Sequence, residues 1–357
     1  MRVLIVDTCY QPFLRAHYAA QPGLDEATYE VQWRALMDRF FGTADSYSHF
    51  LGALGHAAHE IVINCEPLQR SWAADHGVRL KKRFGVFPDV SLILAQAEDF
   101  SPDVVYVQDL NALGPKLLAA LRERSGFLVG QIASKLPADR QLASFDLLLS
   151  SFPHFVARFR ARGLRSDYFR IGFDPRVLAS LENENRVSGA VFVGAVGRSA
   201  TWHSNALLER AAERVPIDFW GYRVGRPPMP SPIRRRYHGE AWGIDMYRVL
   251  ARSRIALNRH GDVAEGSANN MRLYEATGVG TLLITDEQSN LSDIFEPGEE
   301  VVTYANEDEL VKKITHYLEH EAERARIAHA GQQRTLRDHS YERRMRELVE
   351  ILLRYLS

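Results

Sequence analysis

The sequence predicts an α/β protein made of two domains, each built on a parallel sheet. The chain has 357 residues, which is long for one core and ordinary for two domains. Short apolar runs rich in Val, Ile, Leu and Phe alternate with longer amphipathic stretches along the chain. Such runs are typical of parallel strands that helices cover on both faces.

The alternation also divides the chain. It lapses around Leu181-Glu-Asn-Glu-Asn-Arg, where a polar stretch shows no strand or helix period, so we place the linker between 174 and 188. We expect an N-terminal domain over residues 1–180, a C-terminal domain over 189–338, and a final helix over 339–357. An aromatic-rich insert, residues 10–45, follows the first strand. It either packs as a helical hairpin or lines a ligand pocket at the strand end; both can hold.

The expected elements follow from these runs. Strands are expected at Val3–Asp7, Glu60–Cys65, Val104–Gln108, Phe127–Ile132, Leu147–Ser150, Tyr168–Ile171, Ala190–Gly194, Ile217–Trp220, Arg254–Asn258, Thr281–Thr285 and Val301–Tyr304. Helices are expected at Tyr47–Ala57, Val90–Ala97, Pro115–Arg124, Phe155–Arg162, Ser204–Arg214, Asp245–Ala251, Asn270–Thr277, Leu291–Phe295 and Glu307–Glu319, and in the tail from Glu321 to Leu356 with a break near Asp338-His339-Ser340.

Composition limits the classes of function. A formal net charge of −1 creates no overall field that would attract nucleic acid. Cys9 and Cys65 are the two cysteines, too few for a disulfide framework or a cysteine-rich metal site. No stretch approaches the roughly 20 apolar residues of a membrane span. We therefore expect a cytoplasmic protein, with peripheral membrane contact left open.

The sharpest local feature runs from Arg254 to Asp286 and reads as strand, glycine-containing loop, helix, tight turn and strand. Asn269 or Asn270 would cap the helix, whose free N–H groups and positive dipole end would then suit a diphosphate. Arg272 in the first turn would add a charge-assisted contact to a phosphate.

The helix also carries Glu275, one turn after Arg272. A carboxylate there would accept hydrogen bonds from two ribose hydroxyls, as acidic residues do in dinucleotide sites. From spacing alone, Arg272 and Glu275 are equally an ordinary surface ion pair, and Asn269-Asn270 only a cap.

Several segments of the second half resemble one enzyme family. They are Asn258 and His260 after a strand, Asn270-Met-Arg272-Leu-Tyr-Glu275-Ala, Gly278-Val-Gly280, Leu282-Leu-Ile-Thr285-Asp286 and Leu291–Gly298. They resemble the C-terminal domain of bacterial glycosyltransferases with the GT-B architecture, two Rossmann-like doubly wound domains facing across a cleft. More narrowly, they resemble the CgeB-like, spore-maturation-protein group of the group 1 glycosyltransferases. The resemblance is good from about Ala190 to Arg343 and only general before that.

The resemblance implies a donor site for a sugar linked to a nucleoside diphosphate. Glu275 would hold the ribose, while the loop with Asn269 and the helix start at Asn270 would hold the diphosphate. The loop after the domain's first strand would also approach the phosphates, and the next strand end would lie near the base or pack in the core. These further donor-site residues are Gly194, Gly197, Arg198, Trp220, Tyr222 and Asn258.

The family pattern also implies that the first domain binds an acceptor hydroxyl and that the last helix crosses back onto it. Better-known retaining relatives carry two glutamates separated by seven residues, but here Glu265 and Glu275 are further apart. This departure leaves the donor (UDP, GDP or dTDP sugar) and the stereochemical outcome unassigned.

Candidate acid–base groups lie at strand ends. His260 is beside the proposed donor loop, and Asp7, Asp109 and His154 follow strands of the first domain. An inverting enzyme would use one of them to deprotonate the acceptor.

Other motifs give less. Gly194-Ala-Val-Gly197 lacks the third glycine of a dinucleotide fingerprint, and we find no Walker loop, zinc helix or convincing Asp-x-Asp pair. We therefore expect no metal and no cofactor beyond the nucleotide sugar. Arg234-Arg-Arg236 is either a solvated loop or a contact for a phosphate-bearing acceptor or an anionic surface. The alternatives to a transferase are a nucleotide-sugar epimerase and a non-catalytic binding protein.

Overall fold

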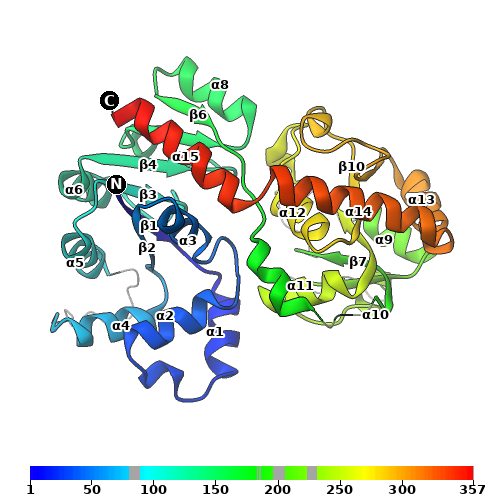
Figure 1. Cartoon of the computed structure of the whole chain (residues 1–357), viewed down its shortest axis with the longest axis horizontal. Helices are drawn as coiled ribbons and strands as arrows, with labels where there is room; N and C mark the ends of the chain where they lie inside the picture. Colours follow the sequence, from blue (N-terminus) through cyan, green and yellow to red (C-terminus); the bar gives the residue numbers. More distant parts are fainter. Residues whose placement is uncertain (80–88, 183, 185, 196–205, 223–230, 357) are drawn as a thin grey trace. The chain divides into compact units, whose positions relative to one another are not determined.

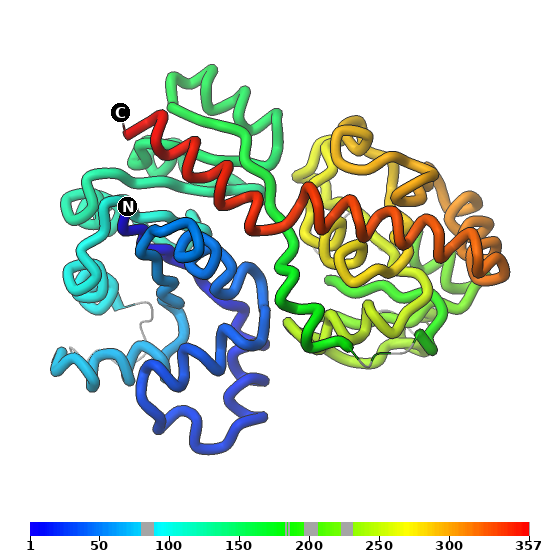
Figure 2. Tube along the Cα trace, viewed as in Figure 1, coloured from blue at the N-terminus to red at the C-terminus, as the bar shows by residue number. Residues whose placement is uncertain are grey.

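The computed structural model describes residues 1–79, 89–182, 184, 186–195, 206–222 and 231–356. The chain forms two compact units. Unit 1 contains residues 1–170 and 344–357, and unit 2 contains residues 171–343. The chain thus leaves unit 1 once and returns to it through its last helix (Figure 2).

Unit 1 is a parallel sheet with the strand order β2-β1-β3-β4-β5-β6 (Figure 1). Its strands are β1 (Arg2–Asp7), β2 (Ala57–Val62), β3 (Val104–Val107), β4 (Phe127–Gln131), β5 (Leu147–Ser150) and β6 (Ser166–Tyr168). Its helices are α1 (Gln11–Ala19), η1 (Leu24–Glu26), α2 (Tyr29–Met37), α3 (Ser46–Ala53), α4 (Glu66–Asp75), α5 (Val90–Phe100), α6 (Pro115–Ser125), α7 (Asp139–Leu142), α8 (Pro153–Ala161) and most of α15 (Tyr341–Leu356). The buried faces of β1 and β3 are apolar on both sides, as a helix-covered parallel sheet requires.

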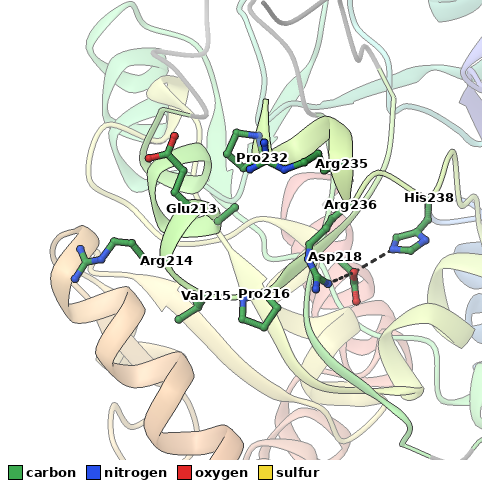
Figure 3. Close-up of a pocket in the computed structure, with 10 residues that line it drawn as sticks. Glu213, Arg214, Val215, Pro216, Asp218, Pro232, Arg235, Arg236 and His238 are labelled. Atoms are coloured by element: carbon green, nitrogen blue, oxygen red, sulfur yellow. Dashed lines mark hydrogen bonds and ion pairs between the residues drawn. The ribbon is translucent and has the colours of Figure 1, made fainter. Parts of the chain in front are cut away.

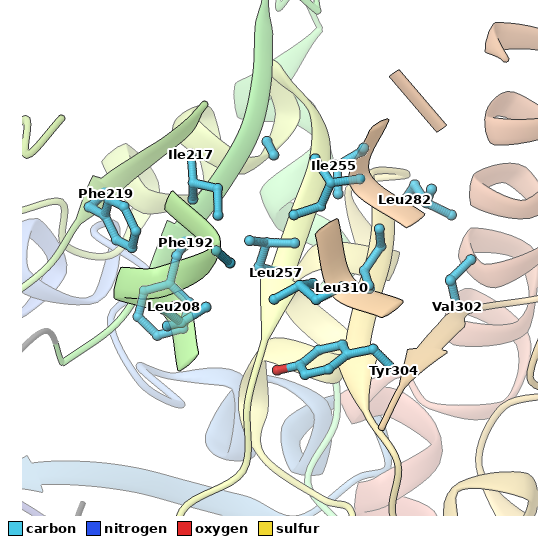
Figure 4. Close-up of a cluster of buried hydrophobic side chains, with 14 of the residues drawn as sticks. Phe192, Leu208, Ile217, Phe219, Ile255, Leu257, Leu282, Val302, Tyr304 and Leu310 are labelled. Atoms are coloured by element: carbon cyan, nitrogen blue, oxygen red, sulfur yellow. The ribbon is translucent and has the colours of Figure 1, made fainter. Parts of the chain in front are cut away.

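Unit 2 is a second parallel sheet with the order β11-β10-β9-β7-β8. Its strands are β7 (Ser188–Val193), β8 (Ile217–Trp220), β9 (Ser253–Asn258), β10 (Leu282–Asp286) and β11 (Val302–Tyr304). Its helices are η2 (Pro175–Leu181), α9 (Ala206–Arg214), α10 (Pro232–Arg235), α11 (Ile244–Ala251), η3 (Asp262–Ala264), α12 (Met271–Gly278), η4 (Leu291–Asp293), α13 (Glu307–Glu319) and α14 (Glu321–Asp338). Phe192, Phe219, Leu257 and Leu282 project from β7, β8, β9 and β10 into one core under α9 and α13 (Figure 4).

The predicted fold class is confirmed: the described chain holds two parallel sheets surrounded by helices. The C-terminal helix packs within unit 1, where Met345, Leu348 and Leu352 are fully buried and Arg354 lies 3.2 Å from Asp167 of β6.

Several element boundaries differ from the sequence prediction. The expected strand Glu60–Cys65 is displaced, because Ala57 already pairs with Arg2 and Cys65 is the N-cap of the unpredicted helix α4. The expected strand Tyr168–Ile171 ends at Tyr168. The expected helix Leu291–Phe295 is only the 3-10 turn η4.

Two segments read as irregular are partly helical. The expected linker contains η2, where the Asp174 side chain caps the backbone N–H of Arg176. The basic cluster expected in a loop begins in the one-turn helix α10, because Pro232 fits the first helical position. The insert 10–45 folds into α1, η1 and α2.

Candidate functional site

The topology of unit 2 marks one edge of its sheet as the place for a ligand. The strand order reverses between β7 and β9. In open parallel sheets, ligands bind outside the carboxyl ends of the strands at such a switch point. Gly194 follows β7, while Asn258 ends β9 and is followed by His260. Gly194, Asn258 and His260 therefore lie at the edge that the topology favours.

An amide network fixes the start of α12 to this edge. The Asn258 Nδ2 donates to Asn270 Oδ1 at 3.1 Å and to Thr285 Oγ1 at 3.0 Å, and the Asn270 Nδ2 returns a bond to Asn258 Oδ1 at 2.8 Å. Asn270 occupies the N-cap position as expected, but its side chain makes no capping bond. The N-terminus of the helix is thus held in place without a side-chain cap on its first N–H groups.

Three buried polar atoms near this helix start have no hydrogen-bond partner within the described residues. They are His260 Nε2, Asn269 Nδ2 and Arg272 Nε. The Asn269 Oδ1 is satisfied, because it accepts from the Tyr274 hydroxyl at 2.6 Å. Buried polar groups are nearly always paired, so polar atoms left free together at one place are available to bind a ligand.

Arg272 and Glu275 form the ion pair that their spacing allows, with 2.8 Å between Arg272 Nη1 and Glu275 Oε2. The pair is not on the surface, because the side chains are only 14% and 8% exposed. Burial raises the pKa of Glu275, and the Arg272 charge opposes that rise. Arg272 Nη1 also lies 2.9 Å from the Met246 sulfur of α11, so the guanidinium is held between two helices.

His260 is bonded to a carboxylate that the sequence analysis did not select. Its Nδ1 lies 2.7 Å from Asp286 Oδ1, and its backbone N–H donates to both oxygens of Asp286 at 3.1 Å. Burial opposes ionisation of Asp286, yet the hydrogen bonds from His260 hold the pKa of this carboxyl below its usual value. The sequence feature that could have predicted a role for Asp286 is its position at the end of β10, the strand next to β9.

The aromatic candidates near β8 pack against other side chains. Trp220 stacks on His238 at 5.3 Å between ring centroids, and Tyr222 lies 5.3 Å from Trp242. The backbone between them is tightly constrained, because a Cβ on Gly221 would lie 1.7 Å from the carbonyl oxygen of Gly194. Gly197 and Arg198 lie outside the described residues.

Unit 1 has its own switch point, between β1 and β3, and two candidate carboxylates lie there. Asp7 ends β1, and Asp109 accepts a 2.7 Å hydrogen bond from the Thr8 hydroxyl. Burial raises the pKa of Asp7 to about 7; a hydrogen bond from the Thr8 backbone opposes the rise and the Asp109 charge adds to it. His154 is in the first turn of α8, and its ring stacks on Phe152 at 5.2 Å.

The basic cluster Arg234–Arg236 lies away from these strand ends. Arg235 and Arg236 line a cavity of about 590 Å³ between α9, α10 and the beginning of β8 (Figure 3). Asp218 accepts from Arg236 at 2.9 Å and from His238 at 3.0 Å, so the carboxylate offsets part of the positive charge. The cavity is lined by acids as well as bases, including Glu213.

The described residues contain no group of three or more His, Cys, Asp or Glu side chains arranged to hold a metal ion. Among them we also find no helix with the length and apolar character needed to cross a membrane.

A protein-family model matches most of the second half of the chain. Residues 198–350 match the protein-family model described as Glycosyl transferase-like. No curated protein matches the chain.

Solved structures share the whole fold at low identity. Anabaena HepE in complex with UDP-glucose matches over 99% of both chains with 14% identity and a TM-score of 0.61. AviGT4, a glycosyltransferase of avilamycin A biosynthesis, matches over 100% of this chain and 98% of its own with 16% identity and a TM-score of 0.61. Sucrose-phosphate synthase from Thermosynechococcus elongatus matches over 100% and 99% with 11% identity and a TM-score of 0.59. The chain therefore has the GT-B fold, and its C-terminal part carries a glycosyl transferase-like domain.

Proposed function

We propose that this protein is a glycosyltransferase that moves a sugar from a nucleoside-diphosphate donor to an acceptor hydroxyl. The observation that carries the proposal is the group of buried, unpartnered polar atoms on His260, Asn269 and Arg272 at the start of α12. They lie inside the segment that matches the glycosyl transferase-like family model.

The chemistry of this group fits a diphosphate. Arg272 Nε and Asn269 Nδ2 are donors, and α12 presents its positive end on the same side. These groups would bind the phosphates and stabilise the negative charge that develops as the diphosphate departs. Gly194, which follows β7, would approach the same phosphates, and Gly197 and Arg198 remain candidates from the sequence for the same contact.

Glu275 would hold the ribose. Burial raises the pKa of Glu275, and the charge of Arg272 opposes this rise and so favours the ionised form that accepts hydrogen bonds from two hydroxyls. Trp220 and Tyr222 are the aromatic residues that we assign to the base side of the donor, near the end of β8.

The acceptor would bind on unit 1 at the carboxyl ends of β1 and β3. Asp7 and Asp109 offer hydrogen-bond acceptors for hydroxyl groups, and Asp7, with a pKa of about 7, has the acid–base range of a general base. His154 and His260 are the further candidates for proton transfer.

The finer assignments are also proposals. The segments from Asn258 to Gly298 support membership of the CgeB-like group. Because HepE was solved with UDP-glucose, UDP sugars are the first donors to test. Cys9 and Cys65 are free thiols, which fits a reducing compartment such as the cytoplasm.

The test measures nucleotide release from UDP-, GDP- and dTDP-sugars, with and without a panel of sugar acceptors. Acceptor-dependent release is the expected result. Epimerised donor without release would instead identify an epimerase, and tight binding with neither reaction would identify a binding protein.

A matched pair of variants localises the reaction. Arg272→Leu should abolish release, while Arg248→Leu should leave it unchanged, because Arg248 is an arginine of α11 paired with Asp245 at 2.9 Å. Equal losses in both variants would contradict the site.

A further inference from the structure

We infer that Asp286 is a positioning residue that fixes the orientation of the His260 ring, so that Nε2 faces the substrate and accepts a hydrogen bond from a sugar or acceptor hydroxyl. The inference rests on the proposed function, because it gives His260 a substrate to meet.

The geometry of the pair fixes the ring. One carboxylate oxygen lies 2.7 Å from Nδ1, and the same carboxylate accepts the backbone N–H of His260 through both oxygens. Backbone and side chain are therefore held by one group, which leaves the ring little freedom to rotate.

The carboxylate is itself held by neighbours. Gln288 Nε2 donates to Asp286 Oδ2 at 2.9 Å, and the Thr285 hydroxyl lies 3.3 Å from Oδ1. Every one of these contacts is a donor directed at Asp286, so the site is arranged for an ionised carboxylate. An ionised carboxylate can only accept, and the hydrogen between the two side chains then belongs to Nδ1.

The other ring nitrogen is the second, independent observation. Nε2 is buried with no partner in the part of the chain that the structure describes, and the His260 side chain is only 2% exposed. Among buried backbone groups, an N–H without an acceptor is rarer than a carbonyl without a donor, and we infer the same preference for this ring nitrogen. The neutral ring with an unprotonated Nε2 is therefore the favoured form, and the lone pair of Nε2 can accept a hydrogen bond from a hydroxyl.

The first test needs no substrate. In protein labelled with ¹⁵N-histidine, and with the His260 signals assigned by loss in His260→Gln, Nδ1 should give the shift of a protonated nitrogen and Nε2 that of a bare one. The reverse pattern, or a doubly protonated ring at pH 7.5, would overturn the inference.

Variants of Asp286 test the cause. Asp286→Ala should let the Nε2–H form appear, whereas Glu287→Gln, a carboxylate-to-amide change at the exposed next residue, should not. Asp286→Asn should keep the wild-type tautomer of His260 in part, because the amide oxygen of the new asparagine can still accept from Nδ1. Its NH₂ group can donate to Gln288 Oε1, which has no partner among the described residues, once the Gln288 amide group flips. Unchanged histidine shifts in Asp286→Ala would contradict the positioning role.

Ligand addition then identifies the hydroxyl. If UDP-glucose changes the ¹⁵N chemical shift of Nε2 and UDP alone does not, the hydroxyl belongs to the donor sugar. If the change requires the acceptor, the hydroxyl belongs to the acceptor. A protonated Nε2 with UDP alone would show a phosphate contact and overturn the inference.

Kinetics separates positioning from folding. With folded protein confirmed by circular dichroism, Asp286→Ala should lower kcat roughly 10- to 100-fold and change the donor KM little. His260→Gln should cost as much, and the double variant no more than either. Wild-type protein without turnover on any donor would contradict the proposed function, while the histidine shifts would still report on the pair. Full kcat in Asp286→Ala would refute the positioning role itself.

Discussion

The two units share one strand order but differ in the chemistry at the switch point. Read from the edge, unit 1 begins β2-β1-β3-β4-β5, and unit 2 repeats this pattern as β8-β7-β9-β10-β11. At the carboxyl ends, unit 1 presents the carboxylates Asp7 and Asp109. Unit 2 presents amides, an arginine and a histidine, and its two carboxylates are already paired, Asp286 with His260 and Glu275 with Arg272. Within the described residues, His260, Asn269 and Arg272 each carry an unpartnered buried polar atom.

We propose that this difference divides the ligands between the units. A diphosphate is stabilised by donors and a helix N-terminus, which is what unit 2 offers. Carboxylates repel phosphates but accept hydrogen bonds from neutral hydroxyls, which is what unit 1 offers. On this basis a neutral acceptor suits unit 1 better than a phosphorylated one.

The backbone at the unit 2 switch point gives the largest expected effect. Gly221 has a φ of +145°, and its Cβ would overlap the Gly194 carbonyl. No described glycine of unit 1 would bring a Cβ against backbone in this way. Gly221→Ala should lower the free energy of unfolding of unit 2 by more than about 4 kcal/mol, measured by urea denaturation.

Gly239→Ala is the control for this variant. Gly239 has a φ of +105° but open space around its Cβ, so only backbone strain of about 1–3 kcal/mol is expected. Equal losses in the two variants would show that the close approach of the two strand ends does not matter.

The next effect tests the donor assignment. Glu275→Ala should weaken UDP binding about 100-fold, because two hydrogen bonds to a buried carboxylate are lost. Removing the negative charge beside Arg272 should also strengthen the attraction between Arg272 and the phosphates of UDP. The contribution of the ribose contact to affinity must therefore be measured separately. Calorimetry with UDP and 2′-deoxy-UDP should show that the wild type prefers UDP and that the variant does not.

Asp7→Asn provides the comparison from unit 1. It should bind UDP as the wild type does, because the carboxylates of unit 1 have no part in the donor site. A similar loss of UDP affinity in Asp7→Asn and Glu275→Ala would remove the distinction between the two switch points.

Features of the fold that depend on residues close together in the sequence could be predicted from the sequence. The strands were found because apolar runs such as Val3–Val6 carry a local pattern. The helix after His260 was found because its cap, glycines and preceding strand are close in sequence. Both signals need only neighbouring residues.

Contacts between distant residues were not readable. Asp286 meets His260 only because β10 pairs with β9 in a register that aligns Thr285 with Asn258. Asn270 was expected to cap its helix, but tertiary structure gives its side chain a better partner in Asn258. Helix α4 was missed because its buried face is short and only Leu68 and Trp72 on it are large apolar side chains, beside Gln69 and Ala73.

A smaller effect concerns the acceptor. If Asp7 acts as the base, the ionised form is active, so kcat/KM for the acceptor should rise with pH around a midpoint of about 7. Asp7→Asn should lower kcat/KM for the acceptor about 10-fold or more and flatten this part of the profile. An unchanged profile in the variant would leave proton transfer to His260 or to another group.

The last effect separates a carboxyl of the fold from one of the site. Glu60 in β2 is buried and accepts a hydrogen bond from the Ser48 backbone N–H at 2.8 Å. Burial raises the pKa of Glu60 to about 8, although hydrogen bonding to Ser48 opposes this rise. Because the native state then holds a proton that the unfolded state has lost, the free energy of unfolding should fall as the pH rises from about 5 to 8. The slope from this one group is at most about 1.4 kcal/mol per pH unit.

Glu60→Gln should make this slope shallower and leave UDP binding and transfer unchanged, as urea denaturation at several pH values and the release assay would show. Asp7 contributes to the same slope, since burial raises the pKa of Asp7 to about 7, so the slope should not vanish in Glu60→Gln. A parallel slope in variant and wild type would mean that Glu60 is ionised in the native protein. Loss of transfer would instead mean that the acidic chemistry of unit 1 extends from its switch point into β2.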